Sequence, residues 1–190
     1  VYDTWGYRTT MGFGYHEFLQ FCEDINAEGM FVCNVGLGCQ GRAGDACPEE
    51  EVDFFIDDAL DAIDYALGDG TTAWSRKRVE NGHPEPFPLK YVEIGNENWG
   101  PVYEKRHDKF YKAIKAKYPQ LKLISTLGLG GQHRHEKVDM IDPHWYVSPE
   151  FFFASDKLFD QQERGDYEIY IGEYAVNQNV GGGNLLGALA

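Results

Sequence analysis

Two glutamates in this chain have the residue type and the setting that bond-cleaving chemistry requires. Glu97 lies in the string IGNENWG (residues 94–100), and Glu173 lies in the string IYIGEYA (residues 169–175). Each glutamate follows an apolar run that ends in a glycine-containing turn. If both runs are strands of one parallel sheet, the two carboxylates stand at the same end of that sheet. A pair of carboxylates placed in this way is what the cleavage of a glycosidic bond requires.

The residues that flank each glutamate help to decide its role, because a glutamate after a strand often only caps the next helix or faces solvent. Gly95 and Gly172 allow a close approach of the backbone. Asn96 supplies a neutral amide that can bind a sugar hydroxyl without competing for the proton, and Tyr174 adds an aromatic wall. These flanks favour a site over a helix cap.

The same strand-end rule selects further candidates for a binding site. His144 and Tyr146 are two residues apart, so both side chains face the same way, although a hydrogen-bonded core histidine is an alternative. Asn34 has the alternative of bonding neighbouring backbone. Trp99 comes two residues after Glu97 and is preferred over Trp5 as a sugar-stacking platform, but tryptophan also fills core edges. The expected site residues are Asn34, Asn96, Glu97, Trp99, His144, Tyr146 and Glu173.

Helical patterns occur in three parts of the chain. The first covers residues 18–25, with Gly29 expected as its C-terminal cap. The second covers residues 49–67, begins after a proline with three acidic residues, and is stopped by Gly68. The third covers about 104–118 and ends before a proline. These helices alternate with strands, as βα units do.

The strands are short apolar runs, and the prolines between residues 70 and 88 predict a loop rather than a helix in that segment. Five strands joined by helices or loops indicate a parallel sheet of the α/β class. The expected strands are residues 30–35, 89–94, 121–125, 140–142 and 168–171.

Composition argues against nucleic-acid and membrane partners. The chain has 17 basic and 31 acidic residues, for a net charge of −14, which repels a phosphate backbone. No apolar stretch approaches the roughly 20 residues that span a bilayer. The four cysteines match no paired metal-binding spacing, so we expect free thiols, with one disulfide between Cys39 and Cys47 left open for an exported chain. We expect no metal and no other cofactor.

A longer string resembles a known family. HPEPFPLKYVEIGNE (residues 83–97) is similar to the fourth-strand signature of family 51 glycoside hydrolases, the α-L-arabinofuranosidases, and IGEYA (residues 171–175) is similar to their seventh-strand signature. An isolated Asn-Glu is shared by many barrel glycosidases, whereas the first string is far more selective. The similarity also covers Glu17-Phe18-Leu19, Asn34, HWY (residues 144–146) and GNL (residues 183–185).

The resemblance implies a partial TIM (β/α)8 barrel, approximately strands three to seven with their helices. Residues 1–190 would form a single incomplete catalytic domain, without the C-terminal β-sandwich of the family. An open five-strand segment exposes two sheet edges, so we expect it to be poorly stable alone. A homo-oligomer is left open for the full-length parent, and an extracellular or periplasmic location is slightly favoured over the cytoplasm.

The resemblance also implies a retaining mechanism with an assigned role for each residue. Glu97 would be the acid/base and Glu173 the nucleophile, with carboxyl groups about 5–5.5 Å apart. We expect burial or a nearby negative charge to keep Glu97 protonated, while Glu173 stays ionised. Asn96 would hold the 2-hydroxyl, Asn34 another ring hydroxyl, and Tyr146 would steer Glu173.

The expected activity is release of terminal non-reducing α-L-arabinofuranosyl groups from arabinose-bearing plant polysaccharides or oligosaccharides. One alternative is another barrel glycosidase with the same pair of strands, such as a xylosidase or an endoglucanase. Another is a carbohydrate-binding remnant without catalysis.

Overall fold

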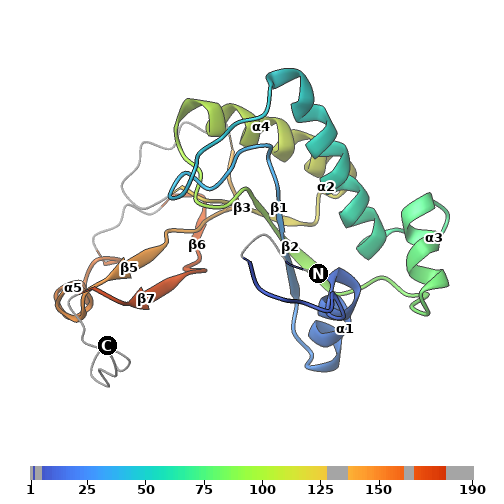
Figure 1. Ribbon diagram of the computed structural model, residues 1–190, viewed down its shortest axis with the longest axis horizontal. Coiled ribbons are helices and arrows are strands. Elements are labelled where there is room, and N and C mark those ends of the chain that lie inside the picture. The colour runs from blue at the N-terminus through green and yellow to red at the C-terminus, as the bar shows by residue number, and fades with distance from the viewer. Residues whose placement is uncertain (1, 3–5, 128–136, 161–164, 179–190) are drawn as a thin grey trace.

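A five-stranded parallel sheet forms the centre of the computed structural model, which describes residues 2, 6–127, 137–160 and 165–178 (Figure 1). The strand order is β1-β2-β3-β4-β6, and each neighbouring pair is parallel. This arrangement confirms the α/β class and the existence of all five expected strands. Their bounds are β1 (Gly29–Cys33), β2 (Leu89–Ile94), β3 (Lys122–Ser125), β4 (Met140–Ile141) and β6 (Glu168–Ile169).

Two further short strands form a separate two-stranded sheet. β5 (Trp145–Val147) and β7 (Tyr174–Val176) pair in parallel with each other (Figure 1). β5 comes soon after β4 in the chain, and β7 comes soon after β6. The segment that contains β4 and β5 therefore pairs twice with the segment that contains β6 and β7. The first ladder joins β4 to β6, the second joins β5 to β7, and a gap separates them.

Two long helices, α2 (Val52–Leu67) and α4 (Gly100–Lys117), cover one face of the sheet. Both pack on β2, and Figure 1 shows them together on one side of the strands. The shared core includes Ile63 of α2, Phe110 of α4 and Val92 of β2, each 0% exposed. Complete burial of side chains of this size contributes about 1.5–3 kcal/mol each. The remaining helices are α1 (Tyr15–Asp24), the 3-10 turn Glu49–Glu51, α3 (Ala73–Glu80) and α5 (Pro149–Ala154).

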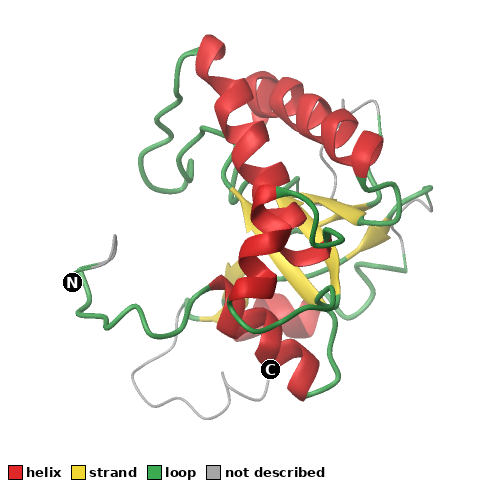
Figure 2. Ribbon diagram, turned by 90° about the vertical axis from the view of Figure 1, so that its right-hand side faces the viewer, coloured by secondary structure: helices red, strands yellow, loops and turns green. Residues whose placement is uncertain are grey.

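The other face of the sheet carries a row of residues in register. Val32 pairs with Glu93, Glu93 with Ile124, and Ile124 with Met140. Successive residues of a strand point to opposite faces, so this row lies opposite the helix-covered face that holds Val92. In Figure 2 the longest helices lie in front of the strands and above them. We call the face opposite these helices the free face, and the site is built at the C-terminal ends of its strands.

The structure corrects the expected loop between residues 70 and 88. α3 occupies Ala73–Glu80, and its N-cap Thr72 accepts a hydrogen bond from Ser75 N–H at 3.2 Å. The prolines lie after this helix and do not interrupt it. Periodicity missed α3 because it is short and buries only the polar side chains Ser75 and Arg78.

The expected bounds of three other elements also change. Gly29 is not a helix cap, because α1 ends at Asp24 and Asn26 takes the left-handed conformation with φ 54°. Gly29 instead begins β1, where a Cβ would lie 3.1 Å from Leu19 Cδ2. β1 ends at Cys33, two residues early, and α4 begins at Gly100 rather than near residue 104. No helix in the described ranges is long and apolar enough to cross a membrane.

Candidate active site

Glu97 lies in a turn that places special demands on its neighbours. β2 ends at Ile94, and Gly95 follows with φ +86°, where a Cβ would meet Asn98 Oδ1 at 2.6 Å. Glu97 itself has φ 48°, which is uncommon for a residue with a side chain. The buried Asn98 holds the turn, because its Oδ1 accepts the Asn96 N–H at 3.0 Å. Backbone strain of this kind is concentrated at functional sites.

The loop of residues 36–47, which follows β1, contacts Glu97 at both its backbone and its side chain. The Cys39 thiol donates a hydrogen bond to Glu97 Oε2 at 2.7 Å. Gln40 N–H donates to the Glu97 carbonyl at 3.1 Å, and Gln40 Oε1 accepts the Trp99 N–H at 2.7 Å. The loop therefore fixes the position of this carboxylate.

A buried arginine fastens the base of that loop to α4. Arg106 is 2% exposed and donates to the carbonyls of Val35 at 3.0 Å and Gly36 at 2.6 Å. It also donates to the Cys47 carbonyl at 2.7 Å. Because these acceptors stand at the two ends of the loop, the guanidinium closes it.

His144 and Glu173 lie in the gap between the two ladders of parallel pairing. Trp145 N–H donates to the Glu173 carbonyl at 3.0 Å, where pairing resumes with β5 and β7. Inside the gap, Asp142 Oδ1 accepts the Gly172 N–H at 2.6 Å. A Cβ on Gly172 would overlap the Asp142 carboxylate, which explains the glycine before Glu173.

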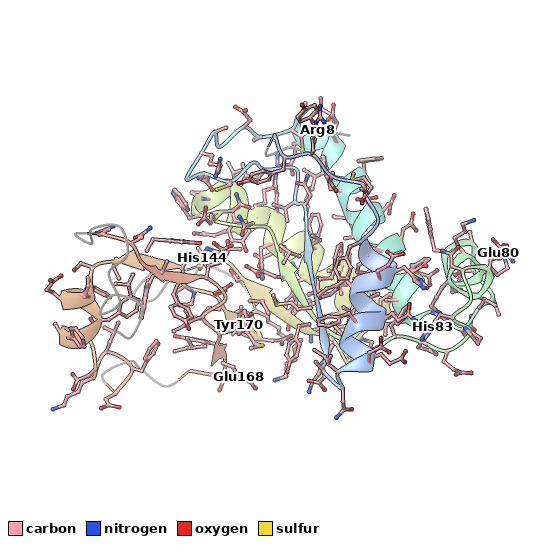
Figure 3. The ribbon with its side chains drawn as sticks, turned by 60° about the horizontal axis from the view of Figure 1, so that its bottom comes forward. Arg8, Glu80, His83, His144, Glu168 and Tyr170 are labelled. Atoms are coloured by element: carbon pink, nitrogen blue, oxygen red, sulfur yellow. The ribbon has the colours of Figure 1, made fainter. Side chains whose placement is uncertain are left out.

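His144 bridges the two predicted catalytic glutamates. Its Nδ1 lies 3.2 Å from Glu97 Oε1 and 3.6 Å from Glu173 Oε2, and its Nε2 lies 3.1 Å from Asp142 Oδ2. One carboxylate oxygen of Glu97 and one of Glu173 lie within 4.8 Å of each other. Tyr146 donates its hydroxyl to Glu173 Oε2 at 2.5 Å. Figure 3 shows His144 on the same part of the molecule as Tyr170, at the other end from the α3 region.

The hydrogen bonds set the charges of this cluster. The contact with Asp142, helped by Glu97, raises the pKa of His144 to about 9, so its imidazole is positive at neutral pH. The hydrogen bond with Glu173 raises the pKa of Tyr146 to about 12. The Cys39 thiol and then His144 lower the pKa of Glu97 below its ordinary value. At neutral pH His144 therefore carries a proton beside the two glutamates, in addition to the protons of the Cys39 thiol and the Tyr146 hydroxyl.

The expectation that Glu97 keeps its own proton at rest is wrong. Its side chain is 28% exposed, and a thiol and an imidazolium face its two oxygens. Hydrogen bonds to the charged form of a carboxyl group favour ionisation. The placement of Glu97 directly after β2 is confirmed.

The donor atoms of this region form two groups of three that are also compact enough to consider for metal binding. One consists of Glu97, His144 and Glu173, and the other of Glu93, Asp142 and His144. His144 belongs to both and already uses Nδ1 and Nε2 in hydrogen bonds to carboxylates. A histidine that binds a metal must be neutral, whereas both nitrogens of His144 contact carboxylates. We therefore describe the two groups as hydrogen-bonded clusters.

A cavity of about 610 Å³ lies beside Glu97. Asn34 and Asn96 contribute to its lining, together with Cys39 and Arg42. Asn34 Oδ1 also accepts the Gly36 N–H at 2.8 Å. Asn34 therefore bonds neighbouring backbone, as the alternative interpretation expected, and lines the cavity as well. The cavity is of a size that ligand sites have.

Similarity to known proteins decides the family of the chain. The family described as "Alpha-L-arabinofuranosidase 1 domain" matches residues 1–164. The chain belongs to the α-L-arabinofuranosidases of glycoside hydrolase family 51. This confirms the resemblance that its two glutamate strings indicated.

Three similar proteins show how far the similarity extends. The chain is 36% identical over 189 residues to α-L-arabinofuranosidase 2 of Arabidopsis thaliana, and the aligned region covers 98% of this chain and 27% of that protein. It is also 36% identical to an extracellular exo-α-L-arabinofuranosidase of Streptomyces chartreusis, over 93% of this chain and 23% of that protein. The arabinose-bound structure of MgGH51 α-L-arabinofuranosidase matches with a TM-score of 0.83 and 32% identity, over 94% of this chain and 29% of that one.

The chain spans about a quarter of the length of the curated relatives that it matches. Its sheet and helices are part of the TIM barrel of family 51, which confirms the expected fold class. The barrel relation explains why the helices cover one face of the sheet and why the site residues lie after the C-terminal ends of the strands.

The structure brings most of the expected site residues together. Glu97, His144, Tyr146 and Glu173 form one hydrogen-bonded cluster. Trp99 stands at the start of α4 with 51% of its side chain exposed. Trp5 and the string at residues 183–185 lie outside the described residues. The four cysteines are free thiols, so the disulfide left open between Cys39 and Cys47 is not formed.

Sequence reasoning missed several groups in and around the site. Asp142 shares the two-residue spacing of His144 and Tyr146, and this signal places it on the same strand face. Glu93 is a charged residue between the apolar residues Val92 and Ile94 of a strand, which is a second usable signal. Asn98 and Arg106 gave no such signal, because their partners lie on loops that are distant in sequence.

Proposed function

We propose that this chain provides both catalytic carboxylates of a retaining α-L-arabinofuranosidase. Its substrates would be terminal non-reducing α-L-arabinofuranosyl groups of plant polysaccharides or oligosaccharides. The names of the relatives from Arabidopsis thaliana and Streptomyces chartreusis, and the arabinose bound to the matching structure, support this substrate class.

The short separation between the two carboxylates carries the proposal. Oxygens of Glu97 and Glu173 lie within 4.8 Å, close to the roughly 5–5.5 Å of retaining enzymes. An inverting enzyme needs about 6.5–9.5 Å, because a water molecule must fit between the base and the sugar. The separation therefore supports direct attack by one carboxylate.

In the first step, a carboxylate oxygen of Glu173 attacks the anomeric carbon. The bond between that carbon and the glycosidic oxygen breaks, and the departing oxygen takes a proton from Glu97. Tyr146 donates its hydroxyl to Glu173 Oε2, which orients the nucleophile for attack. The product of this step is an arabinosyl ester of Glu173.

In the second step, Glu97 removes a proton from water as the water oxygen attacks the same carbon. The ester bond breaks, and Glu173 leaves as a carboxylate. The lowered pKa of Glu97 suits it to this role as a base. Two displacements at one carbon return the original configuration.

The proton for the first step lies next to Glu97 at rest. His144 is positive at neutral pH and its Nδ1 is 3.2 Å from Glu97 Oε1. A sugar that displaces water from the cluster disfavours charge on Glu97, and the proton then moves across this contact. Asn96 and Asn34, on the wall of the adjacent cavity, would hold sugar hydroxyls, with Trp99 as a stacking surface at the rim.

Activity on a panel of nitrophenyl glycosides tests the substrate class, in a chain that supplies the whole barrel. We expect the α-L-arabinofuranoside to be cleaved far faster than xylopyranosides and glucopyranosides. A preference for a pyranoside would contradict the proposal, and sugar binding without turnover would favour the carbohydrate-binding alternative.

Variants of the two glutamates test their roles separately. Glu173→Ala should lose activity by about 10⁴-fold or more on every substrate. Glu97→Ala should lose about 10²–10⁴-fold on substrates with poor leaving groups, but much less on activated aryl glycosides that need little acid help. Glu28→Ala is the control, because Glu28 pairs with Lys90 on the surface. Equal losses for both glutamate variants on an activated substrate would reject the assignment.

A further inference from the structure

Glu93 is a buried carboxyl group that the proposed reaction does not use. It lies on β2 and is 3% exposed. Its neighbours in the row across the sheet are Val32 and Ile124, so neither flanking strand offers it a cation there. Its Oε1 is buried and has no hydrogen-bond partner among the described residues. A carboxyl group in such a place must either hold a proton or have its charge balanced by a partner.

Asp142 is the buried carboxyl group next to Glu93. It is 2% exposed, like Glu93 a carboxyl group inside the protein. Oxygens of Glu93 and Asp142 and a nitrogen of His144 lie within 4.8 Å of one another. Two buried carboxyl groups this close cannot both ionise at neutral pH. One of them must hold a proton.

The hydrogen bonds of Asp142 decide which group is ionised. Its Oδ1 accepts the Gly172 N–H, and its Oδ2 faces His144 Nε2 at 3.1 Å. Two donors therefore stabilise a negative Asp142. Among the described residues, no N–H donor comparable to these two is recorded for Glu93, and its neighbours in the row are apolar, so the neutral form is favoured there. A protonated Glu93 can donate to Asp142.

We propose that Glu93 and Asp142 form a buried acid–carboxylate pair that holds His144 as an imidazolium between Glu97 and Glu173. Glu93 carries the proton of the pair and Asp142 carries its charge. Asp142 also fixes the turn before Glu173 through the Gly172 N–H. The pair is thus a positioning device that acts through His144. This inference takes the roles of Glu97 and Glu173 from the proposed function. The charge states of Glu93, Asp142 and His144 do not depend on that function.

The surroundings of the pair agree with this assignment. Burial, with the negative charge of Asp142, raises the pKa of Glu93 to about 8. Among the titratable groups of the described residues that act on the pair, His144 is the one that can be positive. These groups are Cys33 of β1, Tyr103 of α4, Asp142 and His144 after β4, Tyr170 after β6 and Glu173 before β7.

Titration of His144 tests the proposal without relying on activity. A chain that supplies the whole barrel would be labelled with ¹³C at histidine Cε1, and the His144 signal would be assigned from a His144→Gln variant. In the unaltered protein we expect an imidazole pKa near 9. Glu93→Gln keeps the neutral form and a donor, so the His144 pKa should stay within about half a unit. Asp142→Asn removes the charge, so the pKa should fall by more than about one unit.

The comparison between the two variants decides the proposal. A fall in Glu93→Gln as large as that in Asp142→Asn would show that Glu93 carries the charge, and would overturn the assignment. An unchanged His144 pKa in Asp142→Asn would overturn it as well. Glu28→Gln, at the opposite end of the sheet beside Lys90, is the matched control. If the titrations agree but no arabinofuranoside is cleaved, the proposed function fails while the charge assignment stands.

Carboxyl titration gives a second readout. The Glu93 carboxyl ¹³C signal should titrate near pH 8 and disappear from that range in Glu93→Gln. In Asp142→Asn, Glu93 should titrate at lower pH, because the neighbouring negative charge is gone. Titration of Glu93 at an ordinary carboxyl pKa in the unaltered protein would contradict the proposal.

Discussion

At the scale of single residues, Glu97 is defined by what donates to it. The sequence places it after a strand, but its charge depends on Cys39 and His144, which lie 58 and 47 positions away. The thiol comes from a loop closed by Arg106. A residue that looks like a simple acid in the sequence is therefore a carboxylate held by two donors.

Removal of the Cys39 thiol should raise the pKa of Glu97, because its hydrogen bond is the largest cause of the lowering. On an activated aryl arabinofuranoside the second step limits kcat, and Glu97 must then be ionised. The acid limb of the kcat profile should therefore move to higher pH in Cys39→Ala. Cys39→Ser, which keeps a donor, should show a smaller shift.

Cys47→Ala is the matched control for this prediction. Cys47 lies on the same loop, but its backbone, not its thiol, closes the loop through Gly36. The acid limb of the kcat profile should stay in place in Cys47→Ala. An unmoved limb in Cys39→Ala would mean that the thiol does not tune Glu97.

Residue types at strand ends could be predicted from the sequence, while their charges could not. Asn34, Asn96, Glu97, His144 and Glu173 follow from strand alternation and from the family strings. The protonation of Glu97 and the pair under His144 depend on contacts between segments that no local pattern brings together. Asp142 is the exception, since its spacing from His144 was readable.

At the scale of elements, α3 is held by an arginine rather than by an apolar stripe. Arg78 is 0% exposed and donates to five backbone carbonyls. Three of them belong to the end of α2, where helix carbonyls lack partners. The Thr72 and Ser75 cap was a usable sequence signal for α3, but the polarity of the segment hid it.

Loss of the Arg78 guanidinium should destabilise the domain. Arg78→Met leaves several buried carbonyls without a donor, at a cost of about 3 kcal/mol or more in the free energy of unfolding. Denaturant unfolding of a chain with the whole barrel measures this. Arg76→Met, two positions away and exposed with one bond to Thr71, should change the free energy by less than about 0.5 kcal/mol. Similar effects of both variants would contradict the role of Arg78.

At the scale of the whole molecule, the sheet is open at both sides within the described residues. β1 and β6 each pair on one side only in the sheet order. On the free face of β1, Val32 is 45% exposed. A closed barrel pairs such edges and covers such side chains.

The 190-residue chain alone should therefore be less stable than a chain with the whole barrel. We expect a broad thermal transition and binding of a hydrophobic dye by the shorter chain, and a cooperative transition for the longer one. Circular dichroism on both chains measures this. A cooperative and reversible melt of the short chain at ordinary temperature would refute the expectation.

The central claim is that Glu173 attacks the sugar while Glu97 serves as acid and base. Mass spectrometry of a Glu97→Ala variant tests it most directly, because that variant forms the ester with an activated aryl arabinofuranoside but hydrolyses it slowly. In a chain that supplies the whole barrel, the peptide with Glu173 should carry one anhydropentose. Turnover of the substrate with no adduct, or an adduct on another residue, would contradict the account.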